Sequence, residues 1–232
     1  NAVLVIKSIK ILYMKNKKTI YHFVVDQSGS MSGSEGPTIE GFNSQINTIK
    51  NLQKEYPDNE YVVSVTYFED QVMDIIKFAK INEVQLLSRD NYVPGGLTAL
   101  LDGIGKSIHA VKARYESEIR EDLATVVMVI LTDGGENASQ FFELKQLAGM
   151  IKELDESGKW TFSFLGADLD AVRASANFNI RKENVISFSK RKFSAMMDQT
   201  NESIIQYEKR KAAGKRSSIF FDQIEDKDQR ED

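Results

Sequence analysis

Two patterns of apolar residues alternate along this chain, one typical of strands and one typical of helices. Their order along the sequence predicts the order of the secondary-structure elements. Short runs rich in β-branched and aromatic residues are typical of buried strands, and apolar residues spaced every three or four positions are typical of amphipathic helices. We expect strands at residues 19–25, 61–68, 71–78, 125–131, 160–165 and 185–188. We expect helices at residues 39–56, 98–115, 141–154, 170–178 and 193–211, a charged link at 116–122 and a short helix or irregular segment at 80–89.

The alternation of strands with helices predicts an α/β fold with one main domain. The run 125–131 is apolar on both faces, as a central strand covered by helices requires. Runs 61–68 and 71–78 are joined by a tight turn at Glu69 and Asp70, so they form a hairpin whose second strand is a sheet edge. We therefore expect a doubly wound, mostly parallel sheet of six strands, with one antiparallel edge strand and helices on both faces.

The first predicted strand is followed directly by a polar turn. Asp26 closes the apolar run, and Ser28 and Ser30 follow at alternating positions in a turn rich in glycine and serine. Ligands of open α/β sheets bind at the carboxyl ends of the strands. These side chains offer only oxygen atoms, with no thiol or imidazole among them, and this donor set suits a hard cation such as Mg²⁺.

Two later stretches complete the same pattern. The sequence Pro94-Gly95-Gly96-Leu97-Thr98 leads into a helix, and the apolar run 126–131 ends in Thr132-Asp133-Gly134-Gly135. Asp-x-Ser-x-Ser alone would be weak evidence, but the three pieces in this order and context are specific.

Together these pieces resemble the metal-ion-dependent adhesion site of the von Willebrand factor type A (vWA) domain, in its bacterial, stand-alone, cytoplasmic form. All five motif positions are filled, by Asp26, Ser28, Ser30, Thr98 and Asp133. The resemblance covers residues 17–212, with an N-terminal extension at 1–16 and an acidic tail at 213–232. It implies strand order 3-2-1-4-5-6, which places the first strand beside strand 125–131 at the topological switch point.

The resemblance also implies a function. The five residues would hold Mg²⁺ or Mn²⁺ directly or through water, and an Asp or Glu carboxylate of a partner protein would complete the coordination shell. We expect a binding module and no enzyme, acting as an adaptor in a multi-protein assembly. The oligomeric state stays open.

Each site residue also has an ordinary structural interpretation. Asp26 and Thr98 could cap helices, with the two serines satisfying loop amides. Thr132 is expected to be a strand-end hydroxyl and Glu136 to be solvated, although Glu136 could tune the choice of ligand.

The amino-acid composition argues against several other kinds of site and partner. Cysteine is absent from the 232 residues, which rules out disulfides and thiolate metal sites and fits a reducing compartment such as the cytoplasm. The net charge of −4 gives no basic field for nucleic acid, and the short clusters at 190–192 and 209–211 are read as solvated faces. No apolar run approaches the roughly 20 residues of a membrane span, so no membrane partner is expected. His22 and His109 lie far apart in sequence, so packing or surface roles are expected for them rather than catalysis.

Two alternative functions remain. Mg²⁺-dependent phosphohydrolases of the haloacid dehalogenase type also carry an aspartate after the first strand, but they need a second carboxylate where this chain has Ser28. A scaffold with an unused metal site is the other alternative.

Both ends of the chain carry apolar segments, at residues 3–13 and 218–221. Exposed strand-like segments of this kind favour aggregation unless they are covered. We therefore expect at least one of them to pack, against its own domain or across a subunit contact.

Overall fold

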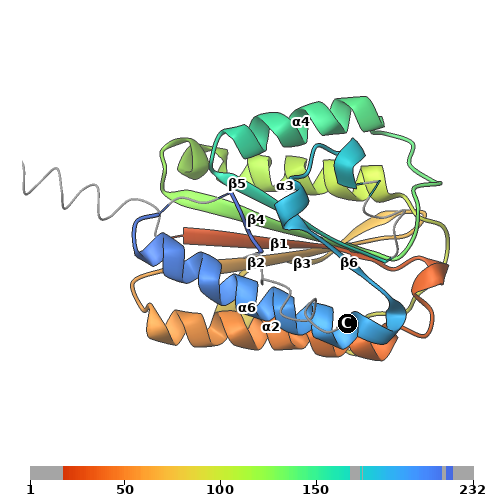
Figure 1. Ribbon diagram of the computed structural model, residues 1–232, viewed down its shortest axis with the longest axis horizontal. Helices are drawn as coiled ribbons and strands as arrows, with labels where there is room; N and C mark the ends of the chain where they lie inside the picture. The colour runs from red at the N-terminus through yellow and green to blue at the C-terminus, as the bar shows by residue number, and fades with distance from the viewer. Residues whose placement is uncertain (1–17, 168–172, 174, 216–217, 222–232) are drawn as a thin grey trace, which may run out of the picture.

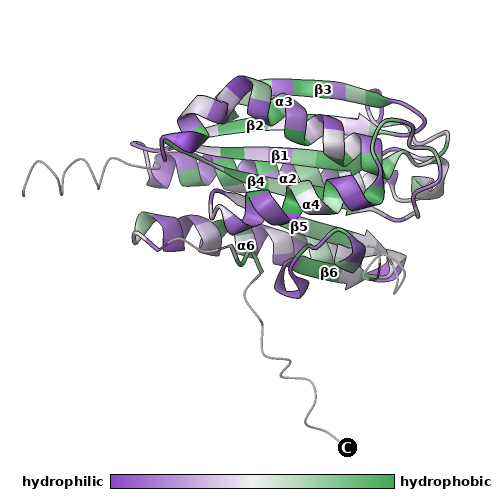
Figure 2. Ribbon diagram, turned by 90° about the horizontal axis from the view of Figure 1, so that it is seen from above, coloured by the Kyte–Doolittle hydropathy of each residue, from purple (hydrophilic) through white to green (hydrophobic). Residues whose placement is uncertain are grey.

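Six strands form one sheet in the part of the chain that the computed structural model describes, namely residues 18–167, 173, 175–215 and 218–221. Figure 2 shows the strands side by side in the order β3-β2-β1-β4-β5-β6. Only β2 and β3 run antiparallel, so the predicted order and the antiparallel edge are confirmed. The strands are β1 (Lys18–Asp26), β2 (Glu60–Phe68), β3 (Val72–Lys80), β4 (Ala124–Thr132), β5 (Trp160–Ala167) and β6 (Val185–Phe188).

Helices cover both faces of the sheet, as expected for a doubly wound α/β fold (Figure 1). Helices α2 (Glu35–Glu55) and α6 (Phe193–Ala212) lie on one face, and α3 (Leu100–Arg120) and α4 (Leu144–Glu156) lie on the other. Every residue of β4 is buried, because a central parallel strand is covered on both sides.

Several helix boundaries differ from the sequence prediction, and α2 begins four residues earlier than expected, at Glu35. The charged link expected at 116–122 is wrong, because α3 continues to Arg120 and its apolar stripe extends through the buried Tyr115 and Ile119. Helix α4 begins three residues later than expected, since the backbone amides of Phe141 and Phe142 bind the carboxylate of Asp102 instead. The helix expected at 170–178 falls largely on residues outside the described ones.

The two helices on one face pack closely against each other. A Cβ atom built on Gly41 of α2 would lie 2.3 Å from Cγ of Met197 on α6, so a larger residue at position 41 would require the Met197 side chain to move. The same two helices exchange polar contacts, because the amide of Asn201 donates to Ser44 and the amide of Gln45 donates to the sulfur of Met197. The first half of α6 is therefore held against α2.

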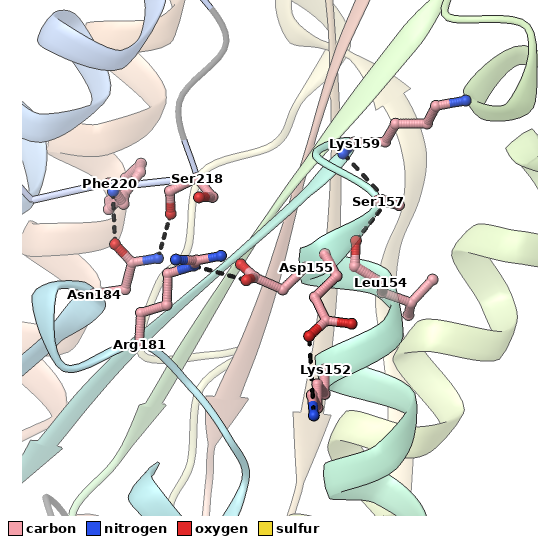
Figure 3. Close-up of polar contacts among 10 residues, drawn as sticks. Lys152, Leu154, Asp155, Ser157, Lys159, Arg181, Asn184, Ser218 and Phe220 are labelled. Atoms are coloured by element: carbon pink, nitrogen blue, oxygen red, sulfur yellow. Dashed lines mark hydrogen bonds and ion pairs between the residues drawn. The ribbon is translucent and has the colours of Figure 1, made fainter.

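The apolar segment near the C-terminus packs against the domain, as predicted for at least one of the two ends. Phe220 and Phe221 are buried in the core on the α2 and α6 side of the sheet. Figure 3 shows Asn184 bound to the backbone of this segment: its side-chain oxygen accepts from the Phe220 amide at 2.7 Å, and its side-chain nitrogen donates to the Ser218 carbonyl at 2.6 Å. The tail expected from residue 213 onward thus includes two side chains, of Phe220 and Phe221, that pack with the domain, and the segment at 3–13 lies outside the described residues.

Asn184 is expected to hold this segment in place. Its side chain is fully buried, so Asn184→Ala would leave a backbone donor and a backbone acceptor without partners, and the free energy of unfolding should fall by about 2 kcal/mol. Urea denaturation measures this loss, with the exposed Asn82→Ala as the control. An Asn184 variant as stable as the control would show that water or a rearranged backbone replaces both bonds.

One histidine is buried and the other is exposed, in line with the predicted packing or surface roles. His22 on β1 is fully buried, with Nε2 at 3.2 Å from the Thr66 hydroxyl. His109 on α3 lies against the ring of Phe142, with 5.5 Å between the ring centroids. Burial lowers the pKa of His22 from 6.5 to about 3, because the imidazolium form would lose its hydration.

This depressed pKa makes stability depend on pH. Below pH 6.5 the unfolded chain protonates His22 while the folded chain does not, so its contribution to stability is complete above pH 6.5 and is lost as the pH falls toward 3. The expected slope is up to about 1.4 kcal/mol per pH unit. Denaturation of wild type and His22→Gln between pH 6 and 4.5 should show a shallower slope in the variant. An equal slope in the two proteins would contradict this contribution of His22.

Candidate metal centre

The sheet topology brings the first and third pieces of the motif together. Asp26 is the last residue of β1, and Thr132 is the last residue of β4. These strands are parallel neighbours, with Val25 opposite Leu131 at the last pair of the register. Asp26 therefore lies beside Thr132, and Asp133 follows directly at the same carboxyl edge of the sheet.

Asp26 is fully buried and held at both carboxylate oxygens. Its Oδ1 accepts from the backbone amide of Ser28 at 2.7 Å, and its Oδ2 accepts from the hydroxyl of Thr132 at 2.5 Å. Burial raises the pKa of Asp26, the hydrogen bonds from Ser28 and Thr132 lower it in part, and the negative charge of Asp133 raises it further. A carboxylate buried beside a second carboxylate is a costly arrangement that a cation would relieve.

The two serines connect the loop that follows β1 to Asp133. The hydroxyls of Ser28 and Ser30 lie 3.0 Å apart, and the hydroxyl of Ser30 donates to Oδ1 of Asp133 at 2.6 Å. The β1 loop and the β4 loop are thus joined by side chains.

Thr98 reaches the same point from a third segment. The loop before it binds the β1 loop through two backbone bonds, from Gly95 N to the Gln27 carbonyl at 2.8 Å and from Gly29 N to the Gly96 carbonyl at 3.1 Å. Gly96 has φ of +69°, a conformation that side chains rarely adopt, which explains a glycine at this turn.

Gly134 shows where the ligand oxygens converge. A Cβ built on it would lie 3.1 Å from the Ser30 hydroxyl, 3.4 Å from the Thr98 hydroxyl and 3.9 Å from Oδ2 of Asp26. Oxygens from three separate segments therefore surround one small space beside a glycine. The structure brings together all five residues that the motif identified.

This oxygen set fits a divalent metal ion. Two carboxylates balance the charge, and neutral hydroxyls leave coordination positions for water, as Mg²⁺ and Mn²⁺ prefer. Among the described residues no three His, Cys, Asp or Glu side chains form a cluster that could hold a metal by themselves. Metal binding would therefore depend on the serine and threonine hydroxyls.

Thr98 is not the N-cap residue of α3, so its interpretation as a helix cap is excluded. Ala99 occupies the N-cap position, and its side chain makes no capping hydrogen bond. Thr132 is a strand-end hydroxyl, as expected, and its bond to Asp26 gives it a role in holding that carboxylate.

Glu136 has contacts that the pattern did not identify. It is exposed, as expected, and its carboxylate also accepts hydrogen bonds from the amides of Leu101, Ala138 and Ser139. The sequence signal for these contacts was a carboxylate in the loop that follows β4, the strand that ends just before Asp133.

Tyr92 is a residue that the pattern did not identify. Its buried hydroxyl donates to the backbone carbonyl of Asp26 at 2.7 Å, and burial raises its pKa well above the usual value. The sequence signal that could have identified Tyr92 was an aromatic residue within the polar loop 88–96. Tyr92 therefore supports the backbone at Asp26, where β1 ends and the loop with Ser28 and Ser30 begins.

This architecture is the vWA fold, an open α/β sheet of six strands with helices on both faces. No protein family model matches the sequence, and no curated protein matches it either. Similar solved structures include the pilus adhesin SpaC from Lactobacillus rhamnosus GG in its open conformation, with TM-score 0.60 and 15% identity over 83% of this chain and 31% of that chain.

Two further structures extend the comparison. The vWF domain of the type V pili tip protein Mfa5 from Porphyromonas gingivalis has TM-score 0.53 and 10% identity, covering 83% of this chain and 96% of that chain. Proximal thread matrix protein 1 from the mussel byssus, whose structure has zinc in its MIDAS motif, has TM-score 0.51 and 18% identity over 82% of this chain and 46% of that chain. This chain spans less than half of SpaC and of the byssus protein.

Proposed function

We propose that this chain is a metal-dependent protein-binding module. The convergence of oxygens from Asp26, Ser30 and Thr98 around Gly134 carries the proposal, because such a site leaves positions open on a bound cation. Ser28 and Asp133 complete the set through the Ser30 hydroxyl. The bound metal would accept the carboxylate of an Asp or Glu on a partner protein.

Mg²⁺ is the preferred cation, with Mn²⁺ as the alternative of similar ligand preference. The residues themselves would place the cation and hold Asp26 ionised through the bonds from Ser28 and Thr132. The metal-bound byssus protein supports the use of a divalent cation in this fold. An adaptor role in a multi-protein assembly is part of this proposal.

The location of the protein stays a prediction. The cysteine-free sequence favours a reducing compartment such as the bacterial cytoplasm, whereas two of the similar structures are pilus proteins. No helix in the described part of the chain has the length and apolarity that a membrane crossing requires.

Affinity capture from the source cell tests the function. Wild type in Mg²⁺ should retain a partner that neither wild type with chelator nor Asp26→Asn in Mg²⁺ retains. Equal capture in all three samples would show that the metal site is not the binding surface, as for a scaffold. Mg²⁺-dependent release of phosphate from a generic phosphomonoester would instead favour the phosphohydrolase alternative, and we expect none.

A further inference from the structure

The N-terminus of α3 has no cap of its own. The first amides of a helix need acceptors from outside the helix, and these normally come from the residue just before it. Here Ala99 occupies that position and offers no acceptor in its side chain. The acceptors come instead from the loop that follows Asp133, which we call the β4–α4 loop (residues 133–143).

Three side chains of the β4–α4 loop bind the start of α3. Oδ1 of Asn137 accepts from the Thr98 amide at 2.8 Å, and Oε2 of Glu136 accepts from the Leu101 amide at 2.8 Å. The hydroxyl of Ser139 accepts from the Asp102 amide at 3.0 Å. The negative charge of Glu136 also lies at the positive end of the α3 dipole.

The helix holds the loop in return. The buried carboxylate of Asp102 accepts from the amides of Gln140, Phe141 and Phe142 at 2.9 to 3.0 Å. The amide of Asn137 donates to the Thr98 carbonyl at 3.0 Å. The connection between the α3 start and the β4–α4 loop is therefore reciprocal and nearly continuous.

Glu136 also closes the loop on itself. Its Oε1 accepts from the amides of Ala138 and Ser139 at 2.9 and 2.7 Å, and its Oε2 accepts from the Ser139 hydroxyl at 2.7 Å. One carboxylate thus fixes both the shape of the loop and its contact with α3.

This connection joins two of the five candidate metal ligands. Asp133 lies three residues before Glu136, and Thr98 lies three residues before Leu101, whose amide Glu136 binds. The position of the Thr98 hydroxyl relative to Asp133 depends on how the helix and the loop are held together. Metal sites built from separate loops lose affinity when the groups that orient their ligands are removed.

We propose that Glu136, with Asn137, is a positioning residue of the metal site: it holds Thr98 and Asp133 at their metal-binding separation without contacting the cation. This inference rests on the proposed function, since it assumes that the site binds a metal. It assigns a role to a residue that the motif does not include.

The test is the dissociation constant of Mn²⁺, measured by calorimetric titration of the whole chain at a temperature where every variant is folded. Glu136→Ala should weaken Mn²⁺ binding about tenfold or more, the range found when groups that orient metal ligands are lost. Glu136→Gln keeps one side-chain acceptor and should be intermediate. Asn137→Ala should also weaken binding, and it decides the matter if Glu136→Ala does not fold.

Two control variants separate positioning from charge and from stability. Glu143→Gln makes the same charge change as Glu136→Gln in the same loop, at an exposed residue whose side chain does not cap α4. Asp155→Asn weakens a partly buried ion pair with Arg181, 2.7 Å long and drawn in Figure 3, on α4 away from the loop. Both should bind Mn²⁺ within about twofold of wild type, because neither side chain holds a ligand-bearing segment.

The outcomes are distinct for the two proposals. A Glu136→Ala variant that loses stability but binds Mn²⁺ as tightly as wild type overturns the positioning role and leaves the metal site in place. A Glu143→Gln variant as weak as Glu136→Gln would show that charge alone is responsible. Wild type that does not bind Mn²⁺ or Mg²⁺ refutes the proposed function, and the positioning role with it.

Discussion

Asp26→Asn should abolish Mg²⁺ binding while the metal-free protein stays as stable as wild type. The substitution keeps the size of the side chain and removes one of the two charges that would face the cation. Loss of a group that orients a metal ligand can weaken metal binding roughly 100-fold, and the affinity for Mg²⁺ should fall by at least this factor. In the metal-free protein the loss of charge also removes the repulsion from Asp133 that raises the pKa of Asp26. Titration calorimetry with Mg²⁺ and thermal unfolding in chelator measure the two quantities.

Asparagine is a sharper choice than alanine at this position. Asp26 is fully buried, so alanine would leave the Thr132 hydroxyl and the Ser28 amide without their acceptor. Asp90→Asn, an exposed carboxylate in the segment before Thr98, is the matched control and should bind Mg²⁺ normally. Undiminished Mg²⁺ binding by Asp26→Asn would place the metal elsewhere in the protein.

Glu208→Leu should cost about 3 to 5 kcal/mol of unfolding free energy, the largest stability effect that we expect from one substitution. Glu208 lies in the last turns of α6 and is 0% exposed. Its carboxylate accepts from the hydroxyls of Thr19 and Tyr21 at 2.8 Å and of Tyr61 at 3.2 Å. Leucine would leave these three buried donors without an acceptor.

Lys211 makes the loss larger. Its ammonium donates to the Thr19 and Thr125 hydroxyls and to the Lys18 carbonyl at 2.7 to 2.9 Å, so the Thr19 hydroxyl lies between the two charged groups. Burial lowers the pKa of Lys211 to about 8, and the negative charge of Glu208 opposes this shift. Without Glu208 the buried ammonium would lose that compensation.

A double-variant comparison tests the network. Glu208→Leu with Lys211→Met should recover part of the stability that Glu208→Leu loses, because both charges are then removed. Glu202→Leu, an exposed carboxylate on the same helix, should change the unfolding free energy by less than about 0.5 kcal/mol. If Glu208→Leu is as stable as Glu202→Leu in urea denaturation, the buried network contributes nothing to the stability of the fold.

Much of the candidate site could be predicted because its signals are local. The apolar run that ends at Asp26 and the one that ends before Asp133 are each visible within a few residues, and the open α/β sheet then brings their carboxyl ends together. Helix boundaries were less certain. The acidic and basic residues of 116–120 resemble a link, and only the burial of Ile119 against the sheet keeps them helical.

The residues that support the site could not be predicted, because their partners are distant in the sequence. Glu136 binds an amide 35 residues away, and nothing in the sequence near Glu136 indicates that partner. Tyr92 supports Asp26 across 66 residues. Composition and periodicity carry no information about such pairs.

The sequence by itself determined the order of strands and helices and the antiparallel edge, since each depends on the spacing of residues close together in the chain. Its resemblance to the vWA motif identified the five oxygen-bearing residues of the candidate site. The tertiary structure decided which polar side chains outside the motif matter. Glu208 contacts Thr19 across 189 residues, and Asn184 holds the backbone of Phe220 across 36. The physical reason is that a buried polar group needs a partner, and only the packing of elements determines which partner is near.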